Sequence, residues 1–184
     1  MYKIDFSKPI HIHFIGIGGI SMSSLAEILH EEGFTISGSD SKESDLTKTL
    51  AAKGIKVIYG QSADNITSDI DLVVYTAAIH ESNPEFAAAK AAGIPMLTRA
   101  ELLGQIMDNY DYSIAVAGTH GKTTTTSMIS EILLAAQTDP TISVGGILSS
   151  IHGNLRVGDS EYFISEACEY TNSFLNFRPR YSII

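Results

Sequence analysis

The chain has 184 residues, of which 44% are hydrophobic and 18% charged, the composition of a folded globular protein rather than a disordered chain. Acidic residues outnumber basic ones 21 to 12, giving a net charge of −9, and no basic stripe is present, which counts against nucleic acid as a partner. One cysteine, no apolar leader and no apolar run near the ~18 residues of a membrane span exclude a disulfide framework and a spanning helix, so we expect a cytoplasmic protein without a membrane partner.

The first hundred or so residues alternate short β-rich runs with helical stretches. Strands are expected at His11–Ile17, Phe34–Ser37, Lys56–Tyr59, Leu72–Tyr75 and Met96–Leu97, and helices at Ser21–Glu32, Leu46–Ala52, Glu85–Ala92 and Ala100–Met107. This alternation predicts a parallel sheet covered by helices on both faces. His11 and His13 fall on one face of the first strand, and we interpret them as the edge or polar face of that strand rather than a metal-binding pair.

A polar break at Asp108–Asp111 separates this pattern from a second one. We place a domain boundary there, so that residues 1–109 and 110–184 form two units. In the second unit we expect strands at Tyr112–Ala117, Thr141–Val144, Tyr162–Ser165 and Tyr181–Ile184, a helix from about Lys122 to Ala136, and turns at Gly145-Gly146 and His152–Asn154. The predicted fold is α/β: a Rossmann-like parallel-sheet domain followed by the beginning of a P-loop α/β ATPase domain.

The second unit has too few expected strands to cover its helix, and its last strand, Tyr-Ser-Ile-Ile, leaves an apolar edge. We therefore expect the chain to be the front part of a longer protein and to be inactive alone. Its C-terminal third is expected to be partly disordered, or held in place by self-association through the open sheet edge.

A glycine loop, Gly16 to Ser21, lies between the first expected strand and helix. Gly16 and Gly18 match the first and third positions of a dinucleotide-binding fingerprint, whereas Ser21 stands where a glycine is expected. Gly16 can form the tight turn, and Gly18 lets a diphosphate approach the helix N-terminus. After the second strand, the turn Ser39-Asp40 places a carboxylate where it can accept from a ribose hydroxyl. These residues predict a nucleotide site, with a glycine turn that binds no ligand as the alternative.

A second loop, Gly118-Thr119-His120-Gly121-Lys122-Thr123, also follows a strand and opens a helix. It has the glycine-lysine-threonine ending of a phosphate-binding loop, although Val116 stands where such loops begin with glycine. We expect the N–H groups from Gly121 to Thr124 to surround phosphates, Lys122 to reach the β- and γ-phosphates, and the Thr123 hydroxyl to bind Mg²⁺.

A divalent cation held by one hydroxyl also needs a carboxylate. Glu166 follows the strand Tyr162–Ser165, and the carboxyl ends of parallel strands line the same sheet edge as a phosphate loop. Glu166 is therefore the candidate metal ligand and Glu169 the nearby competitor. A solvated acidic turn is the alternative for either residue.

The two loops and several shorter segments together resemble the Mur ligases of peptidoglycan synthesis. The matching stretches are HFIGIGGISMSSLAEIL, the SGSD turn, Thr76–Ile79, Asn83-Pro84, Thr98–Glu101, the loop GTHGKT and Glu166–Glu169, and the likeness covers essentially all 184 residues. The match is closest to the family members that take L-alanine. The resemblance implies that L-alanine is joined to the carboxylate of UDP-N-acetylmuramate through an acyl phosphate made from ATP.

The resemblance also implies roles for the two loops. The first domain would hold the UDP part of the sugar nucleotide rather than NAD, and the second would bind ATP and Mg²⁺. Lys122 would stabilise the transferred phosphoryl group, Thr123 and Glu166 would hold Mg²⁺, and His120 would shape the loop. The chain departs from the family at Cys168, where aspartate is usual.

Three other functions stay open from the sequence. A related ligase that attaches a preformed tripeptide to the same UDP-sugar shares the histidine-containing loop. A nicotinamide-dependent oxidoreductase would account for Asp40 but leaves Lys122 unexplained. A nucleotide-binding module without chemistry would account for both loops.

Overall fold

The computed structural model describes residues 3–167 and 176–184. The chain separates into two compact units, Met1–Leu102 and Leu103–Ile184, each of which is described by itself. The division falls inside helix α4 (Arg99–Met107), seven residues before the expected boundary between residues 109 and 110, which stays a prediction.

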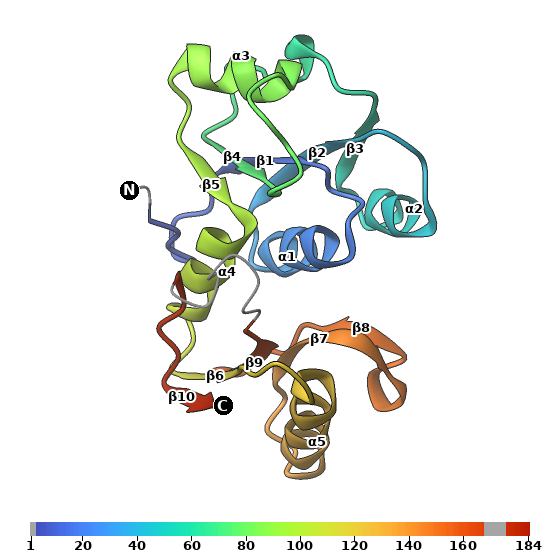
Figure 1. The fold of residues 1–184 in the computed structure, drawn as a ribbon, viewed down its shortest axis with the longest axis vertical. Coiled ribbons are helices and arrows are strands. Elements are labelled where there is room, and N and C mark those ends of the chain that lie inside the picture. The colour runs from blue at the N-terminus through green and yellow to red at the C-terminus, as the bar shows by residue number, and fades with distance from the viewer. Residues whose placement is uncertain (1–2, 168–175) are drawn as a thin grey trace. The chain divides into compact units, whose positions relative to one another are not determined.

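The first unit is a five-stranded parallel sheet with helices on both faces (Figure 1). Strand order is β3-β2-β1-β4-β5, with helix α3 on one face and helices α1 and α2 on the other (Figure 1). The elements are β1 (His11–Ile15), α1 (Ile20–Glu31), β2 (Thr35–Asp40), α2 (Asp45–Ala52), β3 (Lys56–Tyr59), the 3-10 turn η1 (Ala63–Asn65), β4 (Leu72–Tyr75), α3 (Pro84–Ala92) and β5 (Met96–Thr98). The predicted α/β class is confirmed.

Apolar periodicity explains how the helices cover this sheet. The apolar stripe of α1 is fully buried and consists of Met22, Leu25, Ala26 and Leu29. On the opposite face, Ile15 and Val73 pack with Ala89 of α3. Phe86 of α3 also meets Tyr75 of β4 edge to face, with ring centroids 5.0 Å apart.

His11 and His13 share one face of β1 and both contact Ser37 Oγ, which agrees with a polar face of the strand, but the alternative that they lie at an edge is wrong. Strand β1 lies at the centre of the sheet, paired with β2 on one side and β4 on the other. The His13 side chain is completely buried, with Ser37 Oγ 2.9 Å from its Nδ1 and Glu85 Oε1 3.8 Å from its Nε2. Local alternation shows which residues share a face, but it does not show whether the strand has neighbours on both sides.

The second unit has a five-stranded sheet in the order β10-β6-β9-β7-β8. Its elements are β6 (Tyr112–Val116), α5 (Lys122–Ala135), β7 (Thr141–Leu148), the 3-10 turn η2 (Ser149–Ile151), β8 (Gly153–Arg156), β9 (Tyr162–Glu166) and β10 (Tyr181–Ile183). All neighbouring strands are parallel except β7 and β8, which are antiparallel. Helix α5 packs Ile129, Leu133 and Leu134 against Ile142, Val144 and Ile164.

Of the two turns expected in this unit, the one at Gly145-Gly146 is wrong, and the one at His152–Asn154 lies slightly earlier than expected. Strand β7 continues through Gly145-Gly146 instead of ending at Val144, and the pairing of β7 with β8 shifts register between Ser143 and Leu148. The chain turns at η2 and at His152, whose φ is 53°, and β8 begins at Gly153. Glycines that look like a turn in the sequence instead leave space for a side chain from the next strand, as the candidate site shows.

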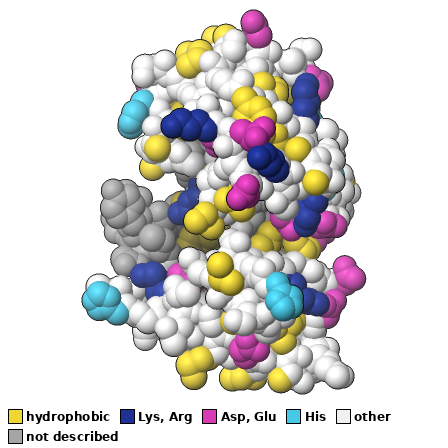
Figure 2. Space-filling view, turned by 90° about the vertical axis from the view of Figure 1, so that its right-hand side faces the viewer, with side chains coloured by type: hydrophobic (Ala, Val, Ile, Leu, Met, Phe, Trp, Pro, Cys, Tyr) yellow, Lys and Arg dark blue, Asp and Glu magenta, His cyan; other side chains and the backbone are white. Residues whose placement is uncertain are grey.

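The surface carries charges of both signs. On the face shown in Figure 2, lysine and arginine side chains alternate with aspartate and glutamate over the described residues. None of the helices within the described residues is long and apolar enough to cross a membrane.

Candidate functional site

The first glycine loop is tied to the end of β2. The N–H groups of Gly16 and Ile17 both donate to the carbonyl oxygen of Ser39, at 2.8 and 2.9 Å. Gly16 has a φ of 84°, a value that favours glycine, so this position confirms the tight turn expected there.

The carboxylate of Asp40 lies against the same loop. Its Oδ2 accepts from the Gly18 N–H at 2.9 Å. A Cβ at Gly18 would meet Asp40 Oδ2 and Thr47 Cγ2, both at 2.8 Å, so the missing side chain of Gly18 makes room for them. Gly18 and Asp40, which the sequence predicts to contact a nucleotide, are thus hydrogen-bonded to each other, and Asp40 stabilises the loop.

The Ser39 hydroxyl points into the protein interior. The residue is completely buried, and its Oγ donates to Glu85 Oε2 at 2.5 Å. The Ser39 carbonyl oxygen therefore accepts hydrogen bonds from the loop, while the Ser39 hydroxyl donates to Glu85 on α3. This orientation is not visible in the Ser39-Asp40 motif, because the partner lies 46 residues away.

Arg99, which was not among the predicted site residues, contacts the N-terminus of α1. A guanidinium nitrogen of Arg99 donates to Ser21 Oγ at 3.1 Å, which places a positive charge at the first turn of α1. The exposed helix N–H groups and a cation together favour an anion. Arg99 is present in the Thr98–Glu101 stretch that carries the family resemblance, but its spacing alone gives no sign of the contact with Ser21.

The second glycine loop joins β6 to α5. Gly118 and Gly121 have φ values of 139° and 80°, and Gly121 forms the N-cap of α5. Lys122 is half-buried, and its Nζ reaches back to donate to the Gly118 carbonyl oxygen at 2.5 Å. The loop side chains Thr119 and His120 are exposed, as are Thr123 and Thr124 in the first turn of the helix.

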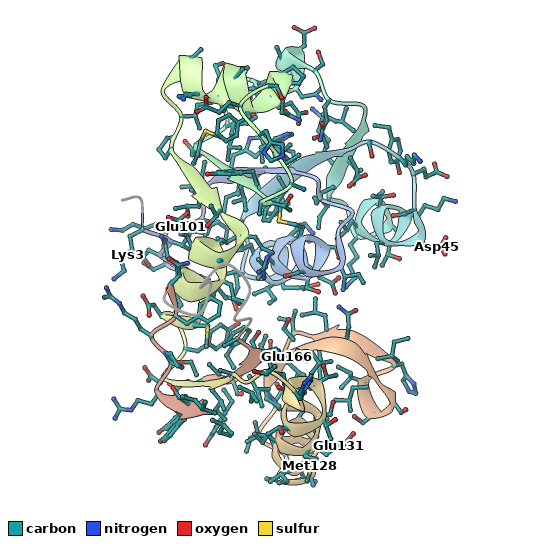
Figure 3. The ribbon with its side chains drawn as sticks, viewed as in Figure 1. Lys3, Asp45, Glu101, Met128, Glu131 and Glu166 are labelled. Atoms are coloured by element: carbon teal, nitrogen blue, oxygen red, sulfur yellow. The ribbon has the colours of Figure 1, made fainter. Side chains whose placement is uncertain are left out.

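Glu166 and Thr123 approach the same pair of glycines. Glu166 stands beside Val116 in the parallel pairing of β9 with β6, and its Oε1 accepts from the Gly145 N–H at 2.7 Å. A Cβ on Gly146 would meet Thr123 Cγ2 at 3.2 Å, and one on Gly145 would meet the Glu166 carboxylate at 3.0 Å. Figure 3 shows Glu166 beside the N-terminal end of α5, with Met128 and Glu131 further along that helix.

These contacts suit a hard cation. A hydroxyl and a carboxylate are the oxygen ligands that Mg²⁺ takes alongside phosphates and water. Within the described residues, no group of three or more His, Cys, Asp and Glu side chains could hold a metal, so two protein oxygens and the nucleotide would have to supply the coordination. Cys168 and Glu169, the departure from the family and the competing ligand, lie outside the described residues.

Helix caps distinguish the two loops from the connections that lead into α2 and α3. Ser44 caps α2 and Asn83 caps α3, each through its side-chain oxygen. Helices α1 and α5 have Gly19 and Gly121 as their N-cap residues, with no side-chain cap and no acidic residue in the first turn. A helix N-terminus without a side-chain cap or an acidic first-turn residue favours an anion from outside the helix.

Each unit thus belongs to the class of α/β proteins in which a glycine loop joins a parallel strand to an uncapped helix, the arrangement that binds phosphate groups. Residues 11–111 match the Mur ligase family, catalytic domain, and residues 116–181 match the Mur ligase middle domain. The chain belongs to the Mur ligase family.

Relatives with known names cover the whole chain. It is 98% identical over all 184 residues to a UDP-N-acetylmuramate–L-alanine ligase of Agathobacter rectalis and 72% identical to that of Lachnospira eligens, in each case covering 40% of the relative. The chain therefore spans about 40% of the length of these curated relatives.

Solved structures show the same fold. The UDP-N-acetylmuramate–alanine ligase of Thermotoga maritima superposes with a TM-score of 0.85 at 35% identity, over 94% of this chain and 40% of that one. The UDP-N-acetylmuramate:L-alanyl-γ-D-glutamyl-meso-diaminopimelate ligase of Neisseria meningitides gives 0.86 at 31% identity, over 95% and 60%.

Proposed function

We propose that the protein is an ATP-dependent ligase that joins L-alanine to the carboxylate of UDP-N-acetylmuramate, and that the two described units hold its two nucleotides. The observation that carries the proposal is the meeting of Thr123 and Glu166 at Gly145-Gly146, next to a lysine in a glycine loop. That set of groups suits phosphoryl transfer. Relatives named as alanine ligases match all 184 residues of this chain, which supports UDP-N-acetylmuramate and L-alanine as the proposed substrates.

In this proposal the second unit binds ATP and Mg²⁺. The N–H groups from Gly121 to Thr124 face the phosphates, with Gly118, Thr119 and His120 forming the loop that encloses them. Thr123 and Glu166 hold Mg²⁺, which when bound neutralises charge on the phosphate oxygens. The γ-phosphoryl group passes to the muramoyl carboxylate, and the amine of L-alanine attacks the acyl phosphate and releases phosphate.

Lys122 has the central electrostatic role in that step. Its ammonium carries three donors, one of which holds the Gly118 carbonyl in this structure. Because its ammonium is held by the loop, Lys122 can stay close to the phosphoryl oxygens as their negative charge changes during transfer, with no movement of the backbone. Its effect is therefore expected on the transition state more than on nucleotide binding.

The first unit binds the UDP part of UDP-N-acetylmuramate. The Gly16–Gly18 turn presents the uncapped N-terminus of α1 to the diphosphate, and Arg99 adds a positive charge beside Ser21. Asp40 accepts from the nucleoside while it braces Gly18. The carbonyl oxygen of Ser39 supports this site by accepting from the N–H groups of Gly16 and Ile17.

The related ligase that adds a preformed tripeptide is the second candidate. Its solved structure superposes as well as that of the alanine ligase, 0.86 against 0.85, so the fold of this part of the protein does not separate the two. The 98% and 72% identities favour alanine. The same relatives favour a ligase over a nicotinamide-dependent oxidoreductase or a module without chemistry.

Calorimetric titration of the 184-residue chain tests the first site. UDP-N-acetylmuramate is expected to bind and NAD is not, and Asp40→Ala should weaken the UDP-sugar by about 1–3 kcal/mol. Tight NAD binding without a response to the UDP-sugar would refute the proposal. Phosphate release by the full-length protein, with L-alanine or the tripeptide as acceptor, then decides between the two ligases.

A further inference from the structure

Glu85, in the first turn of α3, is a carboxylate buried in the protein interior. No other Asp or Glu within residues 3–167 and 176–184 is buried. Removing a carboxylate from water costs free energy unless hydrogen bonds from the protein replace the lost hydration. The partners of Glu85 therefore indicate what its burial achieves, and none of the roles proposed above uses this side chain.

The backbone of Glu85 is fixed at the start of α3. The side-chain oxygen of Asn83, the N-cap, accepts from the N–H groups of Glu85 at 2.9 Å and Phe86 at 3.2 Å. Phe86 meets Tyr75 of β4 edge to face, so this end of the helix is also packed against the sheet. The Glu85 carboxylate thus projects from a backbone that is held by its cap and by the sheet.

A first link joins Glu85 to the end of β2. Glu85 Oε2 accepts from Ser39 Oγ at 2.5 Å, and Ser39 is completely buried. Asp40 is the next residue and the last of β2. Because one peptide bond joins the two, the hydrogen bond from the Ser39 hydroxyl fixes the backbone from which the Asp40 side chain projects.

A second link reaches Asp40 from the side of β3. Asn65 Nδ2, in the 3-10 turn η1, donates to Glu85 Oε1 at 2.5 Å and to the carbonyl oxygen of Gly60 at 3.0 Å. The Gly60 N–H in turn donates to the Asp40 carbonyl oxygen at 2.9 Å. The two oxygens of one carboxylate therefore hold the backbone on both sides of the Asp40 side chain.

Both links need Glu85 as an acceptor. Burial raises the pKa of Glu85, but the polar side chains around it lower it by more, so that pKa lies below its usual value. The carboxylate is therefore ionised at neutral pH and can only accept. It has a separate oxygen for each donor, Oε2 for Ser39 and Oε1 for Asn65.

Asp40 has one carboxylate oxygen to offer a ligand. Its Oδ2 accepts from the Gly18 N–H at 2.9 Å. Its Oδ1 accepts over longer distances, from the Lys42 N–H at 3.3 Å and from Ser41 Oγ at 3.5 Å. A carboxylate has about four acceptor positions, so Oδ1 can also accept from a ribose hydroxyl.

We propose that Glu85 is a positioning residue that holds Asp40 through these two links, and so sets how strongly the site recognises a ribose hydroxyl. The inference rests on the proposed UDP-sugar site. A hydrogen bond weakens steeply when its donor and acceptor are misaligned. When either link is cut, the ribose therefore loses its contact with Asp40, while the diphosphate still meets the N-terminus of α1.

Calorimetric titration of the 184-residue chain with UDP, and with UDP that lacks the 2′- or the 3′-hydroxyl, tests this role. The measured quantity is the ratio of the Kd of the more weakly bound deoxy compound to the Kd of UDP. In the unaltered chain the ratio should be at least about ten, and in Asp40→Ala about one. A variant that only loosens the fold weakens all three nucleotides alike and leaves the ratio unchanged.

Three substitutions vary the links. Glu85→Ala removes both and should bring the ratio close to that of Asp40→Ala. Asn65→Ala, at a half-buried position, removes only the second link and should lower the ratio about threefold. Glu85→Gln can still accept from Asn65 and donate to the Ser39 oxygen, so it should keep the ratio within about twofold of the unaltered value.

The matched control is Glu81→Gln, which alters an exposed carboxylate paired with Lys90 and should leave the ratio unchanged. Circular dichroism identifies a variant that does not fold. If Glu85→Ala is such a variant, the comparison of Asn65→Ala with the control decides the question.

Nitrogen-15 NMR gives a second readout that needs no ligand. The backbone N–H groups of Gly18 and Gly60 both donate to Asp40, one to its carboxylate and one to its carbonyl oxygen. Both amide signals should shift in Asn65→Ala, and neither should shift in Glu81→Gln.

The outcomes separate this inference from the proposed function. If the unaltered chain binds neither UDP-N-acetylmuramate nor UDP, the proposed function fails, and the Gly18 and Gly60 amides alone decide whether Glu85 holds Asp40. If UDP binds but Asn65→Ala changes neither the ratio nor those amides, the positioning role is wrong. A ratio near one in the unaltered chain would mean that Asp40 does not contact the ribose. An equal loss in Glu85→Gln and Glu85→Ala would mean that the two hydrogen bonds do not hold Asp40. Either result overturns the proposal.

Discussion

The two glycine loops each join a parallel strand to a helix but are held in different ways. The Gly16 loop is bonded to the next strand: Ser39 accepts from Gly16 and Ile17, and Asp40 accepts from Gly18. The second loop is closed by its own lysine, since Lys122 donates to Gly118 four residues earlier. The conformation of the first loop therefore depends on residues distant in sequence, while the conformation of the second loop depends mainly on its own side chains.

This difference predicts that the largest single effect on turnover lies in the second loop. If the proposed ligase function is right, Lys122→Ala should lower phosphate release by the full-length protein at least about a hundredfold, because the transferred phosphoryl group would lose a cation. Binding of UDP-N-acetylmuramate should stay unchanged. Lys48→Ala, an exposed lysine of α2, is the control. Equal turnover in Lys122→Ala and the unaltered enzyme would mean that the loop does not contact the reacting phosphate.

The next largest effect concerns the cation. Glu166→Gln keeps an oxygen that can accept from Gly145 but removes the charge, so the Mg²⁺ concentration for half-maximal ATP binding should rise at least about tenfold. Glu131→Gln, on the exposed side of α5, is the matched control. The measurement is a nucleotide titration at increasing Mg²⁺. An unchanged requirement would exclude Glu166 as a ligand.

Alanine substitutions compare the two loops directly. At Gly18 a Cβ would meet Asp40 and Thr47 at 2.8 Å, so Gly18→Ala should destabilise the first unit by about 1–3 kcal/mol and weaken UDP-sugar binding. At Gly121 nothing lies within 4 Å of the added atom, and only the positive φ opposes it, which costs about 1 kcal/mol. Urea unfolding of the two variants gives both values. Equal destabilisation would contradict the difference in packing.

The smallest expected effect is on acid stability. The pKa of Glu85 is lower in the folded chain than its usual value of 4.5, so ionised Glu85 stabilises the fold above that pH, and this contribution is lost as pH falls below about 4.5. Glu85→Gln should lose stability at neutral pH and show a shallower decline in acid. Unfolding midpoints between about pH 3 and pH 7 test this. A parallel decline in both proteins would show that Glu85 does not contribute.

Most of the fold was predictable because strands and helices alternate with clear apolar periods. The strand–loop–helix setting of Gly16 and of Lys122 is a local property, and the structure confirms it. The central place of β1 and the burial of His13 depend on pairing with strands elsewhere in the chain. A window of neighbouring residues carries no information on those partners.

The site was predictable to a similar extent. Glu166 was placed correctly at the end of its strand, because the carboxyl ends of parallel strands share one sheet edge. Gly145-Gly146 was misjudged as a turn, since glycine pairs occur both in turns and where a backbone must leave room for a side chain. Arg99 was missed because its contact with Ser21 joins residues 78 apart.

The position of β9 also determines the order in which the second unit can form. In sequence it follows the β7–β8 hairpin, yet in the sheet it lies between β6 and β7. Hairpins form within about 1–10 μs, whereas pairing between strands distant in sequence is slow. On refolding, amides of the hairpin should gain protection from exchange before those of Tyr162–Glu166. The second glycine loop would then exist for a time without Glu166 beside it, and the proposed Mg²⁺ site would be the last feature of this unit to form.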